Sequence, residues 1–354
     1  MSRFFSEKYS ALTPYVPGEQ PKNKEYIKLN TNENPYPTSK RAIELAGEAA
    51  KHLELYPDPD CALLHGVFAE RLGVKSSEVM ASNGSDEILN FAFMAFCDKN
   101  TPAVFADITY GFYPVFAQID QIPYRVIKLR DDFTLDISDY FNAGGTVFIA
   151  NPNAPTALAL NLGQIEEIIR HNPDNVVVID EAYVDFGAQS AVSLINKYDN
   201  LLVTQTFSKS RSMAGARLGF GIACESLIRD LFTVKYSTNP YNINSSTMAA
   251  GIGTLEDSAY TEENCKKIIE TREKTKLEMK KIGFELTDSV TNFIFARHPE
   301  ISGEEFYLKM KENGILIRHF SSERISDYNR ITIGTPEQMD KFIEIARAIT
   351  EGKI

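Results

Sequence analysis

The sequence predicts an α/β fold with a mostly parallel central sheet in a large domain, followed by a smaller α+β domain. Six short β-rich runs alternate with helical patterns between about residues 40 and 255. After a long amphipathic helix at about 263–283, the pattern shifts to shorter strands and helices. The 354 residues, 43% of them hydrophobic and 24% charged, have the composition of an ordinary globular protein. Together these observations favour more than one domain.

The elements are expected in the following order. Residues 1–38 contain five prolines and little periodicity, which predicts an N-terminal arm that packs on the small domain and on a partner subunit. Residues 39–255 form the predicted large domain, with strand runs at 102–106, 124–129, 146–150, 176–180, 201–206 and 219–223. Residues 256–354 form the predicted small domain, which includes one helix opened by the Ser302 and Glu305 spacing and a last helix from Pro336.

Composition argues against several functional classes. The 37 lysines and arginines are outnumbered by 48 acidic residues, and a net charge of −11 disfavours a nucleic-acid or anionic-membrane surface. The longest apolar runs, such as FAFMAFC at 91–97, are too short to cross a bilayer, and the first ten residues lack the apolar region of a signal peptide. Four cysteines form no CxxC pair, and five histidines show no ligand spacing. We therefore expect a cytoplasmic protein without a metal site.

Ligands of open parallel sheets bind outside the carboxyl ends of the strands, so the residues that follow each strand run are the first candidates. In VVVIDEAYVDF, Asp180 ends an apolar run and Tyr183 follows three residues later. A capping aspartate and a packed tyrosine would explain the pair equally well. Alternatively, the carboxylate holds a ring nitrogen protonated and the phenol donates a hydrogen bond to an oxygen on the same ring.

The segment TQTFSKSRSMAGARLGFG places Lys209 three residues after the run at 201–206, together with Thr206, Ser208 and Arg217. A short basic stretch is by itself typical of a solvated surface. A lysine amine can also form a Schiff base with an aldehyde, while an arginine and hydroxyl groups bind a phosphate. Pyridoxal 5′-phosphate is an aldehyde that carries both a phosphate and a pyridine ring.

Three further segments have two interpretations each. Ser85 and Asp86 in ASNGSDEIL begin a helix, either as a simple cap or as a phosphate cradle. Tyr110 in DITYGFYPVF belongs either to the core or to a platform that stacks on a flat ring. Asn153 in FIANPNAPTALAL is explained by turn chemistry, or it reaches the oxygen of the ring.

Taken together, NGSDE, TYGFY, NPNAPT, DEAYVDF and TFSKSRSMAGARLGF, in this order, resemble the fold type I, class II aminotransferases that use pyridoxal phosphate. The resemblance extends over nearly the whole chain. The segments LTPYVPGE, KLNTNENPY, YPDPD, GILIR and RITIGT resemble a narrower branch of that family. This branch implies a homodimer that transfers the amino group between two small substrates, L-histidinol phosphate and 2-oxoglutarate, in histidine biosynthesis.

The resemblance also implies a role for each candidate residue. Lys209 would bond to the cofactor and move a proton, Asp180 would pair with the ring nitrogen, and Tyr183 with the ring oxygen. Tyr110 would stack on the ring. The residues implied around the cofactor phosphate are Ser85, Asp86, Thr206, Ser208 and Arg217, together with Tyr56 of the other subunit. Those implied in recognising the anionic groups of the substrate are Tyr15, Arg318 and Arg330.

The chain departs from the family pattern at two positions. Ala154 and Ala157 stand where the family commonly has asparagine and glycine, so the ring oxygen would be contacted by Asn153 or by Tyr183 alone. Three other functions are compatible with these residues: an aromatic amino-acid aminotransferase, a pyridoxal-phosphate-dependent decarboxylase of a phosphorylated amino acid, and a non-catalytic protein that kept the fold.

Overall fold

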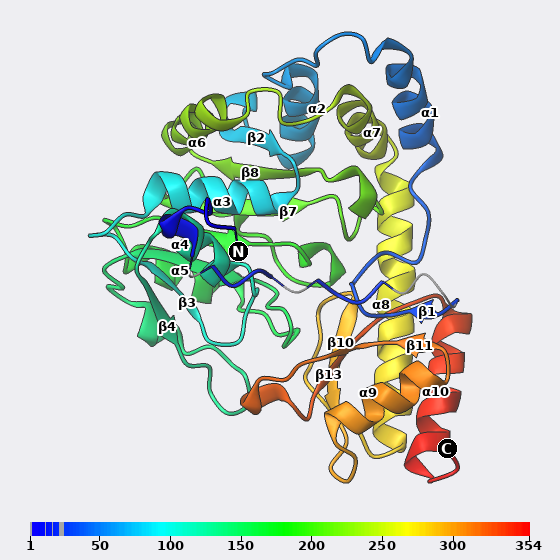
Figure 1. The fold of residues 1–354 in the computed structure, drawn as a ribbon. Helices are drawn as coiled ribbons and strands as arrows, with labels where there is room; N and C mark the ends of the chain where they lie inside the picture. The colour runs from blue at the N-terminus through cyan, green and yellow to red at the C-terminus, as the bar shows by residue number, and fades with distance from the viewer. Residues whose placement is uncertain (1, 11, 16, 21–24) are drawn as a thin grey trace.

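A seven-stranded sheet forms the centre of the larger part of the molecule (Figure 1). The computed structural model describes residues 2–10, 12–15, 17–20 and 25–354; Pro21 of the expected arm lies outside these ranges. The strands lie in the order β2 (Val79–Ser82), β8 (Gly219–Ala223), β7 (Leu201–Thr206), β6 (Val177–Asp180), β5 (Thr146–Ala150), β3 (Ala103–Ala106) and β4 (Tyr124–Ile127).

The sheet is mostly parallel, and the predicted α/β class is confirmed. Strands β4, β3, β5, β6 and β7 run parallel to one another, whereas β8 runs antiparallel to both β7 and β2. All six predicted strand runs are present, and the sequence analysis missed β2. Because β8 reverses direction, the segment 207–218 leaves β7 and returns to β8 at one edge of the sheet. This reversal brings Lys209 and Arg217 to the same edge.

Helices cover both faces of this sheet. Helices α2 (Ala62–Leu72), α5 (Leu162–Arg170) and α7 (Ser245–Glu256) contribute to the core on one face, and α1 (Lys40–Ala49) packs on α7. The core on the other face includes α3 (Ser85–Phe96), α4 (Tyr113–Asp120) and α6 (Glu225–Thr238). Along β6, Val177 and Ile179 belong to the first core and Val178 to the second. Burial on both faces explains why the strand runs are continuously apolar.

A smaller antiparallel sheet follows in the chain, with the order β12 (Arg318–His319), β13 (Asn329–Thr332), β10 (Phe293–Arg297) and β9 (Glu285–Leu286). Helices α8 (Ser258–Lys281), α9 (Gly303–Glu312) and α10 (Pro336–Thr350) accompany it. The Ser302 side chain caps α9 by accepting a hydrogen bond from the Glu305 N–H, as the sequence predicts. The predicted domain limits at 38 and 255 stay predictions.

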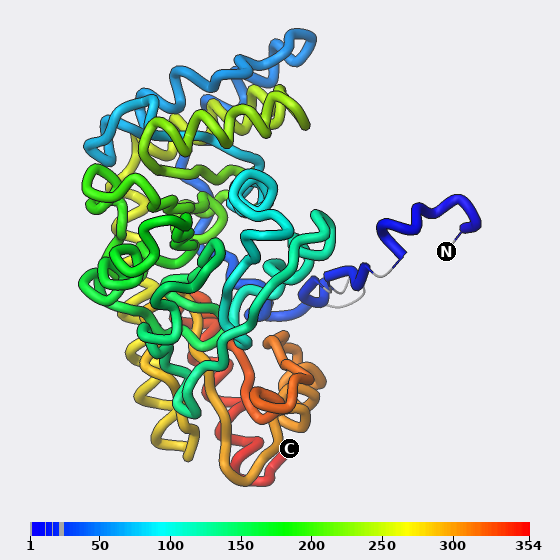
Figure 2. Tube along the Cα trace, turned by 90° about the vertical axis from the view of Figure 1, so that its left-hand side faces the viewer, coloured from blue at the N-terminus to red at the C-terminus, as the bar shows by residue number. Residues whose placement is uncertain are grey.

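The N-terminal segment crosses to the small sheet region. Strand β1 (Ile27–Lys28) pairs in parallel with β11 (Ile315–Leu316), and Lys311 and Tyr307 both bind the Glu19 carboxylate. Residues 2–10, in contrast, stand away from the rest of the chain (Figure 2). Within the described part of the chain, no helix combines the length and the apolar character needed to span a membrane.

Candidate active site

The carboxyl ends of β5, β6 and β7 meet at one edge of the large sheet. Ala150 and Asp180 are neighbours in register, and Asp180 in turn lies beside Thr204. A cavity of about 180 Å³ opens at this edge. It brings together nine of the residues predicted from the sequence: Ser85, Asp86, Tyr110, Asp180, Tyr183, Thr206, Ser208, Lys209 and Arg217.

Asp180 is a buried carboxyl group at the end of β6. Its Oδ2 atom accepts a hydrogen bond from the Tyr113 hydroxyl at 3.1 Å. Its Oδ1 atom is buried and has no hydrogen-bond partner among the described residues. Burial raises the pKa of Asp180 to about 7, even though the bond from Tyr113 favours the ionised form. Because the carboxyl group is buried and one of its oxygens is unpaired, it is suited to form an ion pair with a cation that enters the cavity.

Lys209 lies in the loop after β7 and faces the same cavity. Its Nζ atom donates to the Thr31 carbonyl at 3.3 Å and lies 5.9 Å from the centroid of the Tyr183 ring. The loop itself is held by the Asn34 side chain, which donates to the backbone carbonyls of Lys209 and Ser210 at 3.0 and 3.1 Å. The Thr31 carbonyl therefore holds the lysine amine at the cavity, and the Asn34 side chain holds the backbone of the loop.

One end of the cavity is built to hold an anion. Helix α3 begins at Ser85, and Gly84 before it has no side chain that could cap the first turn, so the Ser85 and Asp86 N–H groups are available to a ligand. Arg217 binds Asp86 at 3.1 Å and Ser208 at 3.3 Å. A Cβ atom on Gly84 would lie 2.6 Å from the Arg217 guanidinium, and Gly84 also has a φ of +77°. The positive φ favours glycine here, whereas the end of the flexible Arg217 side chain could move aside.

Tyr110 lines the same cavity. Its hydroxyl donates to Asp86 at 2.6 Å, and its ring meets the Tyr113 ring edge to face at 5.7 Å. Burial raises the pKa of Tyr110 above its ordinary value, so the phenol stays neutral. The hydroxyl and the ring of Tyr110 are thus each held by a neighbouring side chain. A fixed ring of this kind is suited to stack on a flat ligand.

A second, larger cavity of about 450 Å³ adjoins the first and contains Tyr15, Arg318 and Arg330. Tyr110, Tyr183 and Lys209 border both cavities. The Arg330 Nη2 atom donates to the Asn30 carbonyl at 3.1 Å, and its Nε atom is buried without a partner among the described residues. Burial lowers the pKa of Arg330 from its ordinary value. A guanidinium that is shielded from water and has unused donors is suited to bind a carboxylate or a phosphate.

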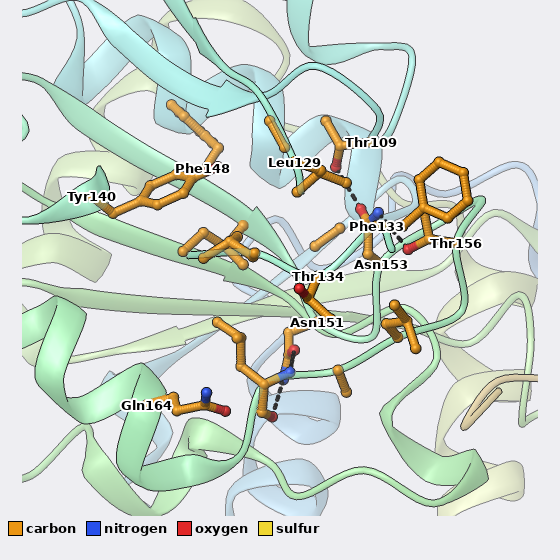
Figure 3. Close-up of a pocket in the computed structure, with 17 residues that line it drawn as sticks. Thr109, Leu129, Phe133, Thr134, Tyr140, Phe148, Asn151, Asn153, Thr156 and Gln164 are labelled. Atoms are coloured by element: carbon orange, nitrogen blue, oxygen red, sulfur yellow. Dashed lines mark hydrogen bonds between the residues drawn. The ribbon is translucent and has the colours of Figure 1, made fainter. Parts of the chain in front are cut away.

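Two predicted residues do not join this site within the chain. Asn153 lines a separate, mainly apolar cavity of about 150 Å³ (Figure 3). Its amide donates to the Ile108 carbonyl and the Thr156 hydroxyl, and its carbonyl oxygen accepts from Thr109. These contacts occupy the Asn153 side chain, which lines neither of the two cavities that Lys209 borders. Tyr56 is 82% exposed and stacks on Tyr241 at 4.7 Å.

Other residues at the site were not singled out from the sequence. Thr31 and Glu33 line the first cavity, Asn32 borders the second, and Tyr113 holds Asp180. Thr31, Asn32 and Glu33 belong to the motif KLNTNENPY, and Tyr113 belongs to TYGFY. The sequence analysis recognised both motifs but assigned no role to these four residues. Within the described ranges, no group of three or more histidine, cysteine or acidic side chains is placed to hold a metal ion.

Comparison with known proteins gives a consistent result. Residues 24–345 match the family model described as aminotransferase class I and II. The chain is 51% identical to the histidinol-phosphate aminotransferase of Brachyspira hyodysenteriae over 97% of this chain and 98% of that protein. It is also 51% identical to the enzyme of the same name from a Marinomonas species, over 96% and 97% of the two chains.

Solved structures share the fold. A histidinol-phosphate aminotransferase from Sinorhizobium meliloti, in complex with pyridoxal-5′-phosphate, has a TM-score of 0.89 at 20% identity, with 100% and 99% of the two chains covered. A putative histidinol-phosphate aminotransferase from Erwinia carotovora atroseptica has a TM-score of 0.86 at 25% identity, with 93% and 97% covered. The predicted fold type is therefore confirmed.

Proposed function

The chain belongs to the family of class I and class II aminotransferases, and from this membership we propose that it is a pyridoxal-phosphate-dependent transaminase of histidine biosynthesis. It transfers the amino group of L-histidinol phosphate to 2-oxoglutarate, giving imidazole acetol phosphate and L-glutamate. The names of relatives that are half identical over nearly the full chain support this substrate. The free thiols of Cys61, Cys97, Cys224 and Cys265 support a cytoplasmic location.

The geometry that carries the proposal is the junction of the two cavities at Lys209. One cavity has an acid and an anion site, and the other has two arginines. Both substrates carry an anionic group at a distance from the reacting carbon. A pair of arginines accepts either a phosphate or a carboxylate, because the planar guanidinium matches both. The same pocket therefore serves both halves of the reaction.

The residues present fit pyridoxal phosphate. The unpartnered Oδ1 atom of Asp180 suits a protonated ring nitrogen, and the open first turn of α3 with Arg217 suits the phosphate. Tyr110 would lie against the ring. When it is bound, the cofactor supplies an aldehyde that exchanges for an amine and a ring that withdraws electrons.

The chain's own residues would divide the work as follows. The Lys209 Nζ atom takes the proton from the substrate carbon that bears the amino group and holds it for return. Asp180 stays ionised against the ring nitrogen, because a cation there offsets the burial that otherwise raises its pKa. Arg330 and Arg318 orient the substrate through its anionic group, with Tyr15 in the same cavity.

A direct test follows the spectrum of the purified protein loaded with pyridoxal phosphate. We expect L-histidinol phosphate alone to remove the visible band of the bound cofactor, and 2-oxoglutarate to restore it with one glutamate per cycle. We also expect kcat/KM for L-histidinol phosphate to exceed that for phenylalanine by at least about 100-fold, because phenylalanine lacks the distal anion and leaves buried guanidinium donors unpaired. Release of carbon dioxide, or a preference for phenylalanine, would contradict the proposal.

We further propose a homodimer in which Tyr56 completes the phosphate site of the partner subunit. The 82% exposure of Tyr56 and the position of residues 2–10, which stand away from the rest of the chain, support this arrangement. Replacing Tyr56 with phenylalanine should weaken cofactor binding about tenfold or more, since a hydrogen bond to a charged group contributes about 1.5–3 kcal/mol. The dissociation constant of the cofactor measures this, and Tyr241→Phe is the matched control. Sedimentation that shows a fully active monomer would exclude the dimer.

A further inference from the structure

Asn32 is a buried residue in a left-handed conformation, with a φ of 59°, at the border between the arm and the second cavity. Its backbone carbonyl accepts a hydrogen bond from the Asn292 side chain at 2.9 Å. Its side-chain Nδ2 atom lies 2.9 Å from the Tyr183 hydroxyl. Asn32 therefore contacts the Tyr183 hydroxyl from a position that borders the second cavity and does not line the first.

The structure assigns a direction to each of these hydrogen bonds. The Asn32 backbone N–H donates to the Thr332 Oγ1 atom at 3.0 Å, so the Thr332 hydroxyl uses its own proton elsewhere. That proton goes to the Asn32 Oδ1 atom, also at 3.0 Å. The amide oxygen of Asn32 thus faces Thr332 and its NH₂ group faces Tyr183. Because an amide NH₂ group only donates, the Tyr183 oxygen must be the acceptor.

The proton of the Tyr183 hydroxyl is thereby directed away from Asn32. Among the described residues, the hydroxyl gives this proton to no acceptor, and Tyr183 borders both cavities. Ala154, which lines the same two cavities, offers only a methyl group. The amide of Asn153 is used by the Ile108 carbonyl and the Thr156 hydroxyl. The neighbouring donor that is free to face a ring oxygen is therefore Tyr183.

We propose that Asn32 is a positioning residue that orients the Tyr183 hydroxyl proton toward the ring oxygen of pyridoxal phosphate. This inference rests on the proposed function. A phenol that donates to the ring oxygen stabilises the anionic form of that oxygen. The charged groups that face Tyr183 are Lys209, whose amine lies 5.9 Å from the ring centroid, and Arg330. Neither residue is replaced in the test: Lys209 is the amine that would bond to the cofactor, and Arg330 keeps its charge in every variant.

The test uses the isosteric variant Asn32→Asp in the full-length protein loaded with pyridoxal phosphate. The introduced carboxylate can only accept, so the Tyr183 proton turns toward it and leaves the ring oxygen. The visible band of the bound cofactor changes with pH, and we expect its midpoint to rise by about one pH unit or more. Tyr183→Phe should raise the midpoint in the same direction, because it removes the donor altogether.

The double variant separates orientation of the hydroxyl from the added charge. In the Tyr183→Phe background, Asn32→Asp should shift the midpoint by less than half of its shift in the wild type, because only the charge effect is left. Thr332→Val provides a second route, since it frees the Asn32 amide without adding charge. It should raise the midpoint in the wild type and leave it unchanged without the Tyr183 hydroxyl.

Each outcome decides the inference. The inference is overturned if Asn32→Asp shifts the midpoint equally with and without the Tyr183 hydroxyl. It is also overturned if neither Asn32→Asp nor Thr332→Val shifts the midpoint. In both cases the proposed function is unaffected. If Asn32→Asp does not fold, the Thr332→Val pair decides alone. Failure of the wild-type protein to develop any visible band with pyridoxal phosphate would instead overturn the proposed function, and this inference with it.

Discussion

Replacement of Lys209 by alanine should abolish the visible band that the cofactor gives in the wild-type protein and lower kcat by at least about 10³-fold. The amine is both the group that bonds to the cofactor and the base that moves the substrate proton, so one substitution removes two functions. No other lysine lines either of the two cavities in the part of the chain that the structure describes. No second amine among those residues is therefore placed to substitute for it.

Spectra and turnover should be measured on the same samples. Lys197→Ala is the matched control, because Lys197 pairs with Glu166 on the surface and its loss should leave both quantities unchanged. The Lys209→Ala protein should still bind the cofactor without a covalent bond, since Asp180, Arg217 and the first turn of α3 are intact. Turnover within tenfold of the wild type would exclude the role assigned to Lys209.

The site could be predicted from the sequence where its residues directly follow a strand. Asp180 ends β6, and Lys209 comes three residues after β7. In a parallel sheet the residues that follow the strands lie together at the carboxyl ends of the strands, whatever the conformation of the loops. Their positions in the sequence are therefore enough to predict that they share a site. The reversal of β8 was not predicted, because GFGIA has the same apolar pattern in either direction. The short strand β2 before NGSDE was missed for lack of a distinctive period.

Contacts between distant segments explain what the sequence could not give. Asn32 binds Tyr183 across 151 residues of chain and Thr332 across 300, so no local pattern indicates its role. Asn153 shows the reverse case. Its position after β5 suggested a cofactor contact, but its amide is used by the Ile108 carbonyl and by Thr156. The direction of a side chain in a turn depends on which neighbouring segment offers a partner, and that is tertiary information.

Replacement of Asp180 by asparagine should lower kcat by about 10³-fold, the order expected when a preorganised charge at the reacting group is lost. Asparagine has nearly the same shape and keeps a hydrogen bond with Tyr113, but it cannot hold the ring nitrogen of the cofactor as a cation. The cofactor should still bind, more weakly. Rates and cofactor dissociation constants measured at pH 8 check both effects, and Asp180→Glu, which keeps the charge, should recover part of the activity.

Loss of stability would not explain this loss of activity, because Asp180→Asn is expected to make the cofactor-free protein more stable at neutral and higher pH. The pKa of Asp180 is about 7 in the folded chain, whereas an unfolded aspartate has a pKa of about 4. Between these values the folded chain holds a proton that the unfolded chain has released, so this carboxyl makes the cofactor-free protein less stable as pH rises through that window. The cost reaches at most about 4 kcal/mol above pH 7.

Asp180→Asn lacks this titration, so the cofactor-free variant should melt at a higher temperature than the wild type at pH 8 and at a similar temperature near pH 4. Glu181, whose pKa burial also raises to about 7, is common to both proteins and cancels in the comparison. Melting curves across this range are the measurement. A variant that is less stable than the wild type at pH 8, or one that keeps turnover within tenfold, would mean that Asp180 is not a buried charge held for a cationic ligand.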